Sequence, residues 1–410
     1  MTVLIAVPTV HSGAADEGAV ELARLLGASG HRAVVVSDGG RLERDLTASG
    51  AEIVRLNLAS RSPLAMVRNA FALRRVIAEH GCNVVHALAR APAWSAFLAA
   101  RMAGKPLVTT WYNGFRDQNT FKRFYNGVMA RGERVIAANS RIAEVIAARY
   151  RGASGRIVVI PPPPADLAAF DPAQVAPQRI AAVRSAWDVA TGIRAVVVIG
   201  HILRRNGHHV VVRAAARLKQ MGLRDFTFVF IGEDPGRSSY AGELWDLVLA
   251  TQTSDVIRLA GPPADLPAAY GAATAVVSPV IQLEGSQRSL LEAMAMARPV
   301  IASDLAAGPD VVMAPPAVAE DRITGFTFRS GDEEALAAAV IRLLSAPESV
   351  RLSIGRRGRN HALSRFAAGD AAAQMLALYL ELAPGTARSG PLWRKIRKTF
   401  GLPRNSMQRR

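Results

Sequence analysis

Short apolar runs alternate along this chain with longer stretches in which apolar residues recur every three or four positions. The first run, residues 2–7, predicts a buried strand, and the apolar stripe from Gly18 to Ser29 predicts a helix. Six more strands are predicted in the first half: Ala33–Ser37, Ile53–Leu56, Val84–His86, Leu107–Thr110, Val135–Ala138 and Ile157–Ile160. Strands that alternate with helices predict an α/β fold with a parallel, doubly wound sheet.

A run of prolines, residues 161–164, interrupts this pattern, because proline continues neither a helix nor a central strand. The alternation then resumes. Strands are predicted at Ala195–Ile199, Phe226–Ile231, Val256–Leu259, Ala275–Ser278 and Val300–Ser303, and helices at His208–Met221 and Tyr240–Ala250. We therefore predict two domains, residues 1–163 and 164–365, each built on a parallel sheet, followed by a helix at about 366–384 and a tail, 385–410.

Composition narrows the class of protein. The chain has 410 residues, half of them hydrophobic, which is enough for two cores. A single cysteine, Cys82, excludes an intramolecular disulfide framework, no run of about 18 apolar residues predicts a membrane span, and the start of the chain does not resemble a signal peptide. We expect a cytoplasmic protein. Its net charge of +17 favours anionic partners without choosing between nucleic acid, anionic lipid and a phosphorylated substrate.

The segment from Leu283 to Ser303 carries the clearest chemistry. Glu284 follows a predicted strand, and Glu292 lies eight residues later in a predicted helix that Pro299 ends. The first N–H groups of this helix, at residues 286–289, and its dipole form an anion site that fits a diphosphate. Alternatively, Ser289 and Glu292 form a capping box, in which Glu292 only closes the helix start.

This order, with the second acid inside Leu290–Ala295 and with Pro299–Asp304 after it, resembles the donor-sugar motif of the retaining group 1 glycosyltransferases. The resemblance implies the GT-B fold, in which two Rossmann-like domains face one another across a cleft, and a helix such as that at 366–384 crosses back to the first domain. It also implies that Glu284, a catalytic candidate, lies by the donor sugar and that Glu292 binds the nucleotide ribose. The donor-binding segment would further comprise Gly285, Ser286, Gln287, Arg288 and Ser289.

Two earlier segments resemble the same family. The stretch that begins at Arg258 and runs through Tyr270 to Pro279 has the order of residues that precedes the glutamate pair there. The loop at Gly232 is similar to the family's glycine loop near the nucleotide. By this resemblance, Arg258 and Gly232 join the donor-binding residues.

The loop that begins at Gly200 departs from the family pattern. The family usually has Gly-Arg and, five residues later, Lys-Gly, whose cations neutralise the leaving diphosphate. Here His201 and Asn206 occupy the cationic positions, and by the resemblance they join the donor-binding residues together with Gly200. Arg204 and Arg205 are the catalytic candidates that could supply the charge, because a guanidinium binds phosphate bidentately, or they are solvated surface residues.

The first domain departs further. Gly13 lies where the family has a glycine pair that approaches the donor phosphates, but Ala14 follows it. Tyr112 or Asn113 replaces the histidine expected on the acceptor side. In the second domain, Gln287 and Ala297 stand where glycines are usual.

No Asp-x-Asp sequence follows a strand and no His/Cys cluster has metal-ligand spacing, so we predict neither a metal ion nor a cofactor besides the nucleotide-sugar substrate. From Arg388 to Arg410 the tail holds eight cations and no acid, with apolar residues on one helical face. It predicts an anchor on an anionic membrane surface or, alternatively, a disordered basic tail. Phe121–Tyr125 is a second basic-aromatic segment.

The leading hypothesis is a retaining, metal-independent glycosyltransferase that moves a sugar from a nucleotide-diphosphate donor to a lipid-linked glycan acceptor. It would act in the cytoplasm, peripherally at the inner face of the membrane, in lipopolysaccharide or surface-polysaccharide assembly. The missing histidine and glycines motivate an alternative, a catalytically weakened relative that serves as a membrane-associated scaffold or regulator. Nucleic-acid binding rests on charge alone, and we do not expect it.

Overall fold

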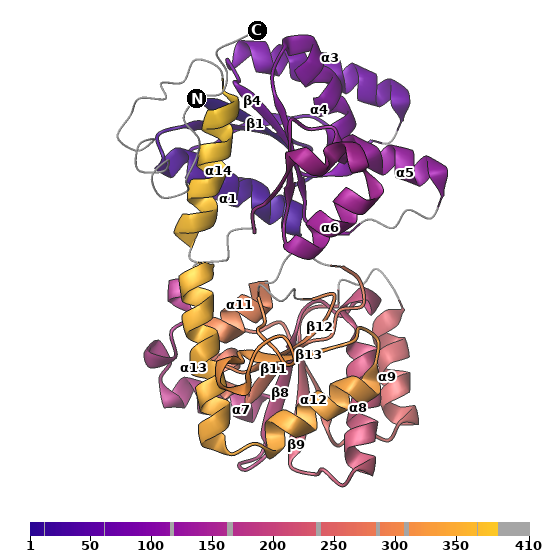
Figure 1. Ribbon diagram of the computed structural model, residues 1–410, viewed down its shortest axis with the longest axis vertical. Helices are drawn as coiled ribbons and strands as arrows, with labels where there is room; N and C mark the ends of the chain where they lie inside the picture. Colours follow the sequence, from indigo (N-terminus) through magenta and orange to yellow (C-terminus); the bar gives the residue numbers. More distant parts are fainter. Residues whose placement is uncertain are drawn as a thin grey trace. The chain divides into compact units, whose positions relative to one another are not determined.

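The computed structural model describes residues 1–11, 13–60, 62–114, 119–161, 167–234, 239–283, 288–306, 311–366 and 368–383. The chain divides into two compact units, one formed by residues 1–163 together with the segment that starts at Gly369, and the other by residues 164–368. In each unit, helices pack on both faces of a sheet (Figure 1).

Within the described residues, the first unit is built on seven parallel strands in the order β3-β2-β1-β4-β5-β6-β7. The strands are β1 (Thr2–Ala6), β2 (Arg32–Ser37), β3 (Glu52–Arg55), β4 (Val84–Ala87), β5 (Leu107–Trp111), β6 (Arg134–Ala137) and β7 (Ile157–Val159). The helices are α1 (Ala14–Ala28), α2 (Glu43–Ala48), α3 (Pro63–Glu79), α4 (Arg90–Ala103), α5 (Thr120–Asn126), α6 (Ser140–Arg149) and the late α14 (Ala368–Leu382), with 3₁₀ turns η1 (Gly127–Ala130) and η2 (Arg151–Arg156). All seven predicted strands are confirmed.

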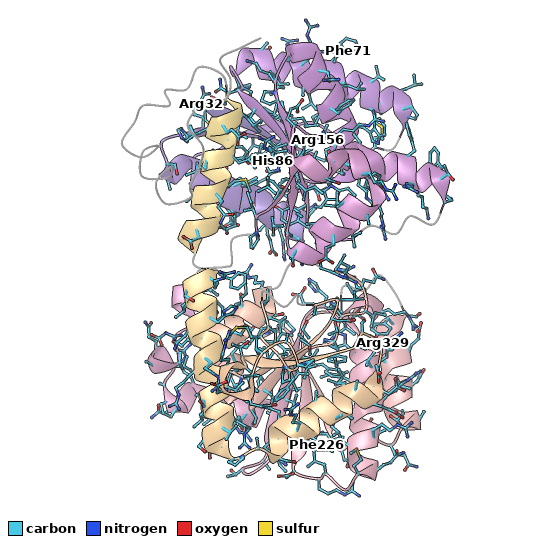
Figure 2. The ribbon with its side chains drawn as sticks, in the orientation of Figure 1. Arg32, Phe71, His86, Arg156, Phe226 and Arg329 are labelled. Carbon is cyan, nitrogen blue, oxygen red and sulfur yellow. The ribbon has the colours of Figure 1, made fainter. Side chains whose placement is uncertain are left out.

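One face of this sheet holds a buried polar network that fixes α14. Side chains alternate between the faces of a strand, so Val84 and His86 of β4 point the same way, toward α1 and α14. There the Tyr379 hydroxyl lies 2.6 Å from His86 Nδ1, and the Thr110 hydroxyl lies 2.7 Å from Nε2. Burial lowers the pKa of His86 to about 3, so the ring is neutral and bonds both hydroxyls. Figure 2 labels His86 at this position.

The second unit is built, within the described residues, on six parallel strands in the order β10-β9-β8-β11-β12-β13. The strands are β8 (Arg194–Ile199), β9 (Phe226–Ile231), β10 (Ile257–Gly261), β11 (Ala275–Ser278), β12 (Val300–Ser303) and β13 (Gly325–Phe328). The helices are α7 (Pro177–Ala186), α8 (His208–Gln220), α9 (Tyr240–Ala250), α10 (Leu266–Ala272), α11 (Arg288–Ala295), α12 (Glu333–Ser345) and α13 (Glu348–Arg365), and the 3₁₀ turn η5 (Arg204–Asn206) precedes α8.

Both faces of the second sheet are covered, as parallel sheets require. Phe226, Phe228 and Phe230 of β9 belong to the cluster on the side of α8, α9 and α12. Val229 and Ile231, one residue out of phase, belong to the opposite cluster with α10 and α11. Each buried phenylalanine stabilises the fold by about 1.5–3 kcal/mol relative to exposure.

The edge strand β13 was not predicted from the sequence. It is only four residues long and begins with Gly325, and glycine is rare within strands. The structure gives the reason for that glycine: a Cβ there would lie 2.3 Å from the carbonyl oxygen of Val300, on the neighbouring strand β12. The close approach of the two backbones excludes any side chain, which also removes the residue pattern that would have identified the strand.

Candidate active site

The loops that follow β8 and β11 diverge at the centre of the second sheet. β8 and β11 are neighbours, but the chain continues from β8 to β9 on one side and from β11 to β12 on the other. Open α/β sheets bind ligands at such a switch point, outside the carboxyl ends of the strands. The residues predicted for the donor site, except Arg258 and Gly13, follow β8, β9 or β11.

Glycines let the backbones of these loops touch. Gly207 has a φ of +75°, and a Cβ there would lie 1.9 Å from the carbonyl oxygen of Pro279, just after β11. A Cβ on Gly232, just after β9, would lie 2.1 Å from the carbonyl oxygen of Gly200. Neither distance admits a side chain. The conformation and packing of the loops alone therefore explain these glycines, whether or not they also contact a ligand.

Hydrogen bonds fix the loop after β8. The Ile281 N–H donates to the Arg205 carbonyl oxygen at 2.8 Å and thereby joins this loop to the one after β11. The Asn206 side-chain amide donates to the His201 carbonyl oxygen at 2.8 Å. Asn206 thus holds its own loop, whereas the His201 side chain is exposed.

The two arginines of this loop differ in their surroundings. Arg204 forms an ion pair with Glu243 of α9, and its guanidinium carbon lies 5.2 Å from the centre of the Tyr240 ring. Arg205 is exposed, and no side chain of the described residues pairs with it. Arg205 is therefore the better placed of the two to neutralise a phosphate, because Arg204 already has an acidic partner.

The carboxylate of Glu292 is held in one orientation. It is only 2% exposed and lies in α11, directly after the loop from β11. The Tyr270 hydroxyl donates to its Oε2 at 2.9 Å, and Arg288 Nε donates to its Oε1 at 2.8 Å. Burial, and then the charge of Glu292, raise the pKa of Tyr270 well above its usual range, so the hydroxyl remains a donor. A buried acceptor with two oriented donors results.

The capping-box alternative does not fit this helix. α11 already includes Arg288, so Ser289 is inside the helix and not the residue before it, as a capping box requires. The Ser289 carbonyl oxygen instead lies 3.1 Å from the Tyr270 hydroxyl. The other four predicted residues of this segment, Glu284, Gly285, Ser286 and Gln287, lie outside the described residues.

Arg258 lies away from these loops. It is near the amino end of β10, paired in register with Val229, whereas the loops leave the sheet after Ile231 and Gly261. Its guanidinium donates to the carbonyl oxygens of Ser254 and Asp255, at 3.2 Å each. The structure therefore does not bring Arg258 together with the other residues predicted to bind the donor, because it lies near the amino end of its strand and they follow the carboxyl ends of theirs.

In the first unit, Gly13 precedes α1 with a φ of +125°, a conformation that favours glycine, and its carbonyl oxygen accepts the Glu17 N–H at 2.9 Å. The first turn of α1 carries Asp16 and Glu17. Their negative charges suit the helix dipole, but they oppose a phosphate at the same helix end. This helix start is less favourable for a donor diphosphate than the start of α11.

Tyr112 is a core residue and not an exposed acceptor contact. Burial raises the pKa of its hydroxyl, and a Cβ on Gly18 of α1 would lie 2.1 Å from that hydroxyl oxygen. The ring therefore fills the space that Gly18 leaves. Asn113, the other candidate for the acceptor side, is exposed just after β5.

Tyr270, one of the two described donors to Glu292, was not predicted from the sequence as part of the candidate site. A signal was present, because Tyr270 is the polar side chain in the apolar segment Leu266–Ala272, and a buried tyrosine hydroxyl usually needs a partner. Only the packing of α10 against α11 shows that this partner is Glu292.

Ala297, where the resemblance implies a glycine, has a φ of +53°. The left-handed conformation costs a residue with a Cβ about 1–2 kcal/mol. We therefore expect Ala297→Gly to raise the free energy of unfolding by about 1 kcal/mol in urea denaturation. Ala338→Gly, exposed within α12, is the matched control and should lower it by about 0.5–1 kcal/mol. Destabilisation by both substitutions would show that Ala297 is not strained.

Within the described ranges, no three His, Cys, Asp or Glu side chains are grouped so that they could hold a metal ion. No helix in this part of the chain is long and apolar enough to cross a membrane.

Family comparisons place both units among glycosyltransferases. Residues 193–346 match the family described as glycosyl transferases group 1. Residues 17–163 match the family described as glycosyltransferase family 4. No curated protein matched the chain.

Solved structures share the fold over more than nine tenths of this chain. A glycosyltransferase from Rickettsia africae is 24% identical with a TM-score of 0.81, over 94% of this chain and 99% of that one. HepE from Anabaena, solved with UDP-glucose, is 18% identical with a TM-score of 0.77, over 93% and 100%. WaaG, a glycosyltransferase involved in lipopolysaccharide biosynthesis, is 14% identical with a TM-score of 0.68, over 93% and 100%. The expected fold of two parallel-sheet, Rossmann-like domains is confirmed.

Proposed function

Because this chain is a glycosyltransferase whose second unit matches the group 1 family, we propose that it transfers a sugar from a nucleotide-diphosphate donor to a lipid-linked glycan. We further propose that the reaction retains the anomeric configuration and needs neither a metal ion nor a cofactor. HepE, which has the same fold, was solved with UDP-glucose, and this supports the class of donor.

The observation that carries the proposal is the buried Glu292 carboxylate beside the switch point. Tyr270 and Arg288 orient it, and a carboxylate in a fixed orientation can accept hydrogen bonds from the two hydroxyls of a ribose. The N-terminus of α11 and Arg205 would then face the diphosphate, because both follow strands at this switch point.

In the proposed reaction, the bond between the anomeric carbon and the diphosphate oxygen breaks, and its electron pair leaves with the diphosphate. The acceptor hydroxyl forms the new bond to the same carbon and gives up its proton to the departing phosphate oxygen. Arg205 and the N–H groups at the start of α11 stabilise the negative charge that develops on the leaving group. Glu284, which lies outside the described residues, would orient the sugar.

We place the reaction in the cytoplasm at the inner face of a membrane, in the assembly of lipopolysaccharide or another surface polysaccharide. The basic, amphipathic tail from residue 385 to 410 supports this location, because its cations are attracted to anionic lipid. The tail lies outside the described residues. The role of WaaG in lipopolysaccharide biosynthesis is consistent with this pathway.

The test is a calorimetric screen of UDP-, GDP- and ADP-sugars, followed by a transfer assay with a lipid-linked acceptor. We expect one nucleotide sugar to bind and to be consumed. Donor binding without turnover on any lipid acceptor would favour the alternative of a catalytically weakened scaffold. The absence of donor binding would overturn the proposal.

In the same screen, Arg205→Ala should weaken binding of the nucleoside diphosphate about tenfold or more and leave the free nucleoside unaffected, since a charged hydrogen bond contributes about 1.5–3 kcal/mol. Arg204→Ala should have less effect, because Arg204 is paired with Glu243. Arg224→Ala, exposed between α8 and β9, is the matched control. Equal losses for the diphosphate and the nucleoside would exclude charge neutralisation by Arg205.

A further inference from the structure

The proposed reaction does not use a strongly basic surface on the first unit. Residues 84–156 contain 12 Lys and Arg but only three Asp and Glu, so they carry +9 of the net charge of +17. Aromatic residues lie on α4 and α5, and cations lie on the same two helices, on the turn η2 and at Arg131, directly after η1. We name as the basic-aromatic surface the residues Trp94, Phe97, Arg101, Phe121, Arg123, Phe124, Arg131 and Arg151.

Contacts between rings and cations join α4 and α5 into one surface. The Arg131 guanidinium carbon lies 5.5 Å from the ring centres of Trp94 and Phe97, and 5.9 Å from that of Phe124. The rings of Trp94 and Phe124 are 5.4 Å apart. Such contacts hold the aromatic rings in place without taking the positive charge away from solvent. The surface is therefore a fixed arrangement of cations and rings.

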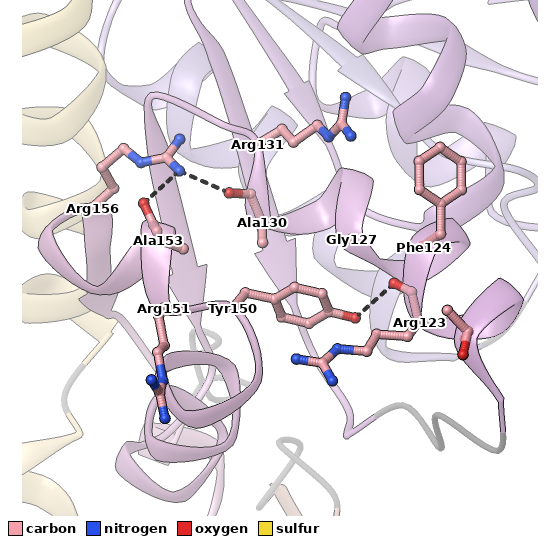
Figure 3. A pocket seen from close by; sticks show the side chains of 11 residues that line it. Arg123, Phe124, Gly127, Ala130, Arg131, Tyr150, Arg151, Ala153 and Arg156 are labelled. Carbon is pink, nitrogen blue, oxygen red and sulfur yellow. Dashed lines mark hydrogen bonds between the residues drawn. The ribbon is translucent and has the colours of Figure 1, made fainter.

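A pocket of about 460 Å³ opens on this surface between α5 and η2 (Figure 3). Arg156 forms part of its wall and donates to the carbonyl oxygens of Gly132 and Ala130 at 2.6 and 3.1 Å. The Tyr150 hydroxyl donates to the Arg123 carbonyl oxygen at 3.1 Å. Four arginines and no acid line the pocket: Arg123, Arg131, Arg151 and Arg156. The wall of the pocket is largely apolar, and the positive charge of these arginines surrounds it.

Exposed apolar side chains flank the cations. Phe121 is 75% exposed, although it is a large aromatic residue. On α3, which packs against α4, Leu64 is 84% exposed, and Val67 and Phe71 are also exposed on the same helical face. Figure 2 shows Phe71 on the outer side of this helix. Aliphatic side chains insert between acyl chains but do not stack on bases, so these residues favour lipid over nucleic acid.

We propose that the basic-aromatic surface, together with the exposed face of α3, docks on an anionic phospholipid bilayer. Arginines of the pocket contact lipid phosphates, and Phe121 enters the boundary between headgroups and acyl chains. The inference rests on the proposed function, because a lipid-linked acceptor is reached only at a membrane. It does not depend on the tail, which is a separate source of attraction to the same surface.

The test is co-sedimentation of the full chain with vesicles of phosphatidylglycerol and phosphatidylcholine in equal parts, compared with phosphatidylcholine alone. Phe121→Ser and Arg151→Glu each change an exposed side chain, so both variants should fold, as thermal unfolding will verify. We expect each to weaken binding to the anionic vesicles about tenfold, and neutral vesicles to bind the parent chain poorly. Met221→Ser, 62% exposed on the second unit, and Arg224→Glu are the matched controls and should bind as the parent does.

Undiminished vesicle binding by both variants, or loss only on removal of residues 385–410, would overturn the inference and leave the proposed transfer reaction standing. Equal binding to neutral vesicles would also overturn it. If the two variants instead lose binding to a single-stranded oligonucleotide and keep binding to vesicles, the surface serves nucleic acid. Donor affinity, measured by calorimetry on the same variants, should be unchanged, so a failure of the proposed function is detected separately.

Discussion

Replacing Glu292 by glutamine should weaken binding of the nucleotide-sugar donor about ten- to a hundredfold, measured by calorimetry. The glutamine keeps the size of the side chain and accepts the Tyr270 hydrogen bond, but it removes the negative charge. Hydrogen bonds to a charged group contribute about 1.5–3 kcal/mol each, and ribose hydroxyls would lose that contribution. Arg288 loses this ion pair too, but its side chain is 48% exposed and stays solvated, so folding should be little affected.

Two comparisons separate binding from packing. Tyr270→Phe removes one donor to the buried carboxylate, so it should lower the free energy of unfolding by about 1–3 kcal/mol and raise KM more than it lowers kcat. Glu320→Gln, an exposed acid paired with Arg342, is the control and should leave donor affinity unchanged. If Glu292→Gln lowers the melting temperature and donor affinity stays the same, Glu292 only joins α10 to α11.

Acidification should lower the free energy of unfolding already between about pH 7 and pH 5, a range in which most carboxylates are still ionised. The pKa of His86 is about 3 in the folded protein, against 6.5 in the unfolded chain. Below about pH 6.5 the unfolded chain therefore binds a proton that the folded protein does not. The free energy of unfolding then decreases as the pH is lowered, until the pH reaches the pKa of the folded protein. Between about pH 7 and pH 5 this one group should cost about 2 kcal/mol.

A second buried histidine adds to this effect. Burial first, and then the neighbouring His209, lower the pKa of His208 at the start of α8 to about 4, and the sign of its contribution is the same. Urea denaturation at a series of pH values measures the sum. His86→Gln keeps groups that can hydrogen-bond to Thr110 and Tyr379 but does not titrate. It should reduce the slope by at most about half, because burial also lowers the pKa of His31 and of His209. His201→Gln, an exposed position, is the control and should leave the slope as it is. An unchanged slope in His86→Gln would show that His86 is not the group responsible.

The sequence predicted best those features that depend on the periodicity and type of residues within a short segment. Twelve strands were predicted within one or two residues of their ends, because buried parallel strands are short apolar runs between helices. The remaining described strand, β13, was not predicted. Its glycine, Gly325, interrupts the apolar run, and it is required there because the backbone of Val300 lies too close for a side chain. Glu292 was predicted as a ribose contact from its position in a segment that resembles a known family. The structure shows it buried and hydrogen-bonded beside the switch point, and its contact with a donor stays a prediction.

By itself, the sequence determined two parallel α/β sheets, the helix that carries Glu292 and the excess of positive charge, since all of these follow from residue type and spacing along the chain. The tertiary structure decided which neighbours each polar side chain meets. The Tyr270 hydroxyl donates to Glu292, and Glu243 forms an ion pair with Arg204. The Tyr112 ring packs against Gly18, and Arg258 lies near the amino end of β10, away from the loops. These outcomes depend on contacts between residues tens of positions apart, and the packing of whole elements sets such contacts where no local pattern can encode them.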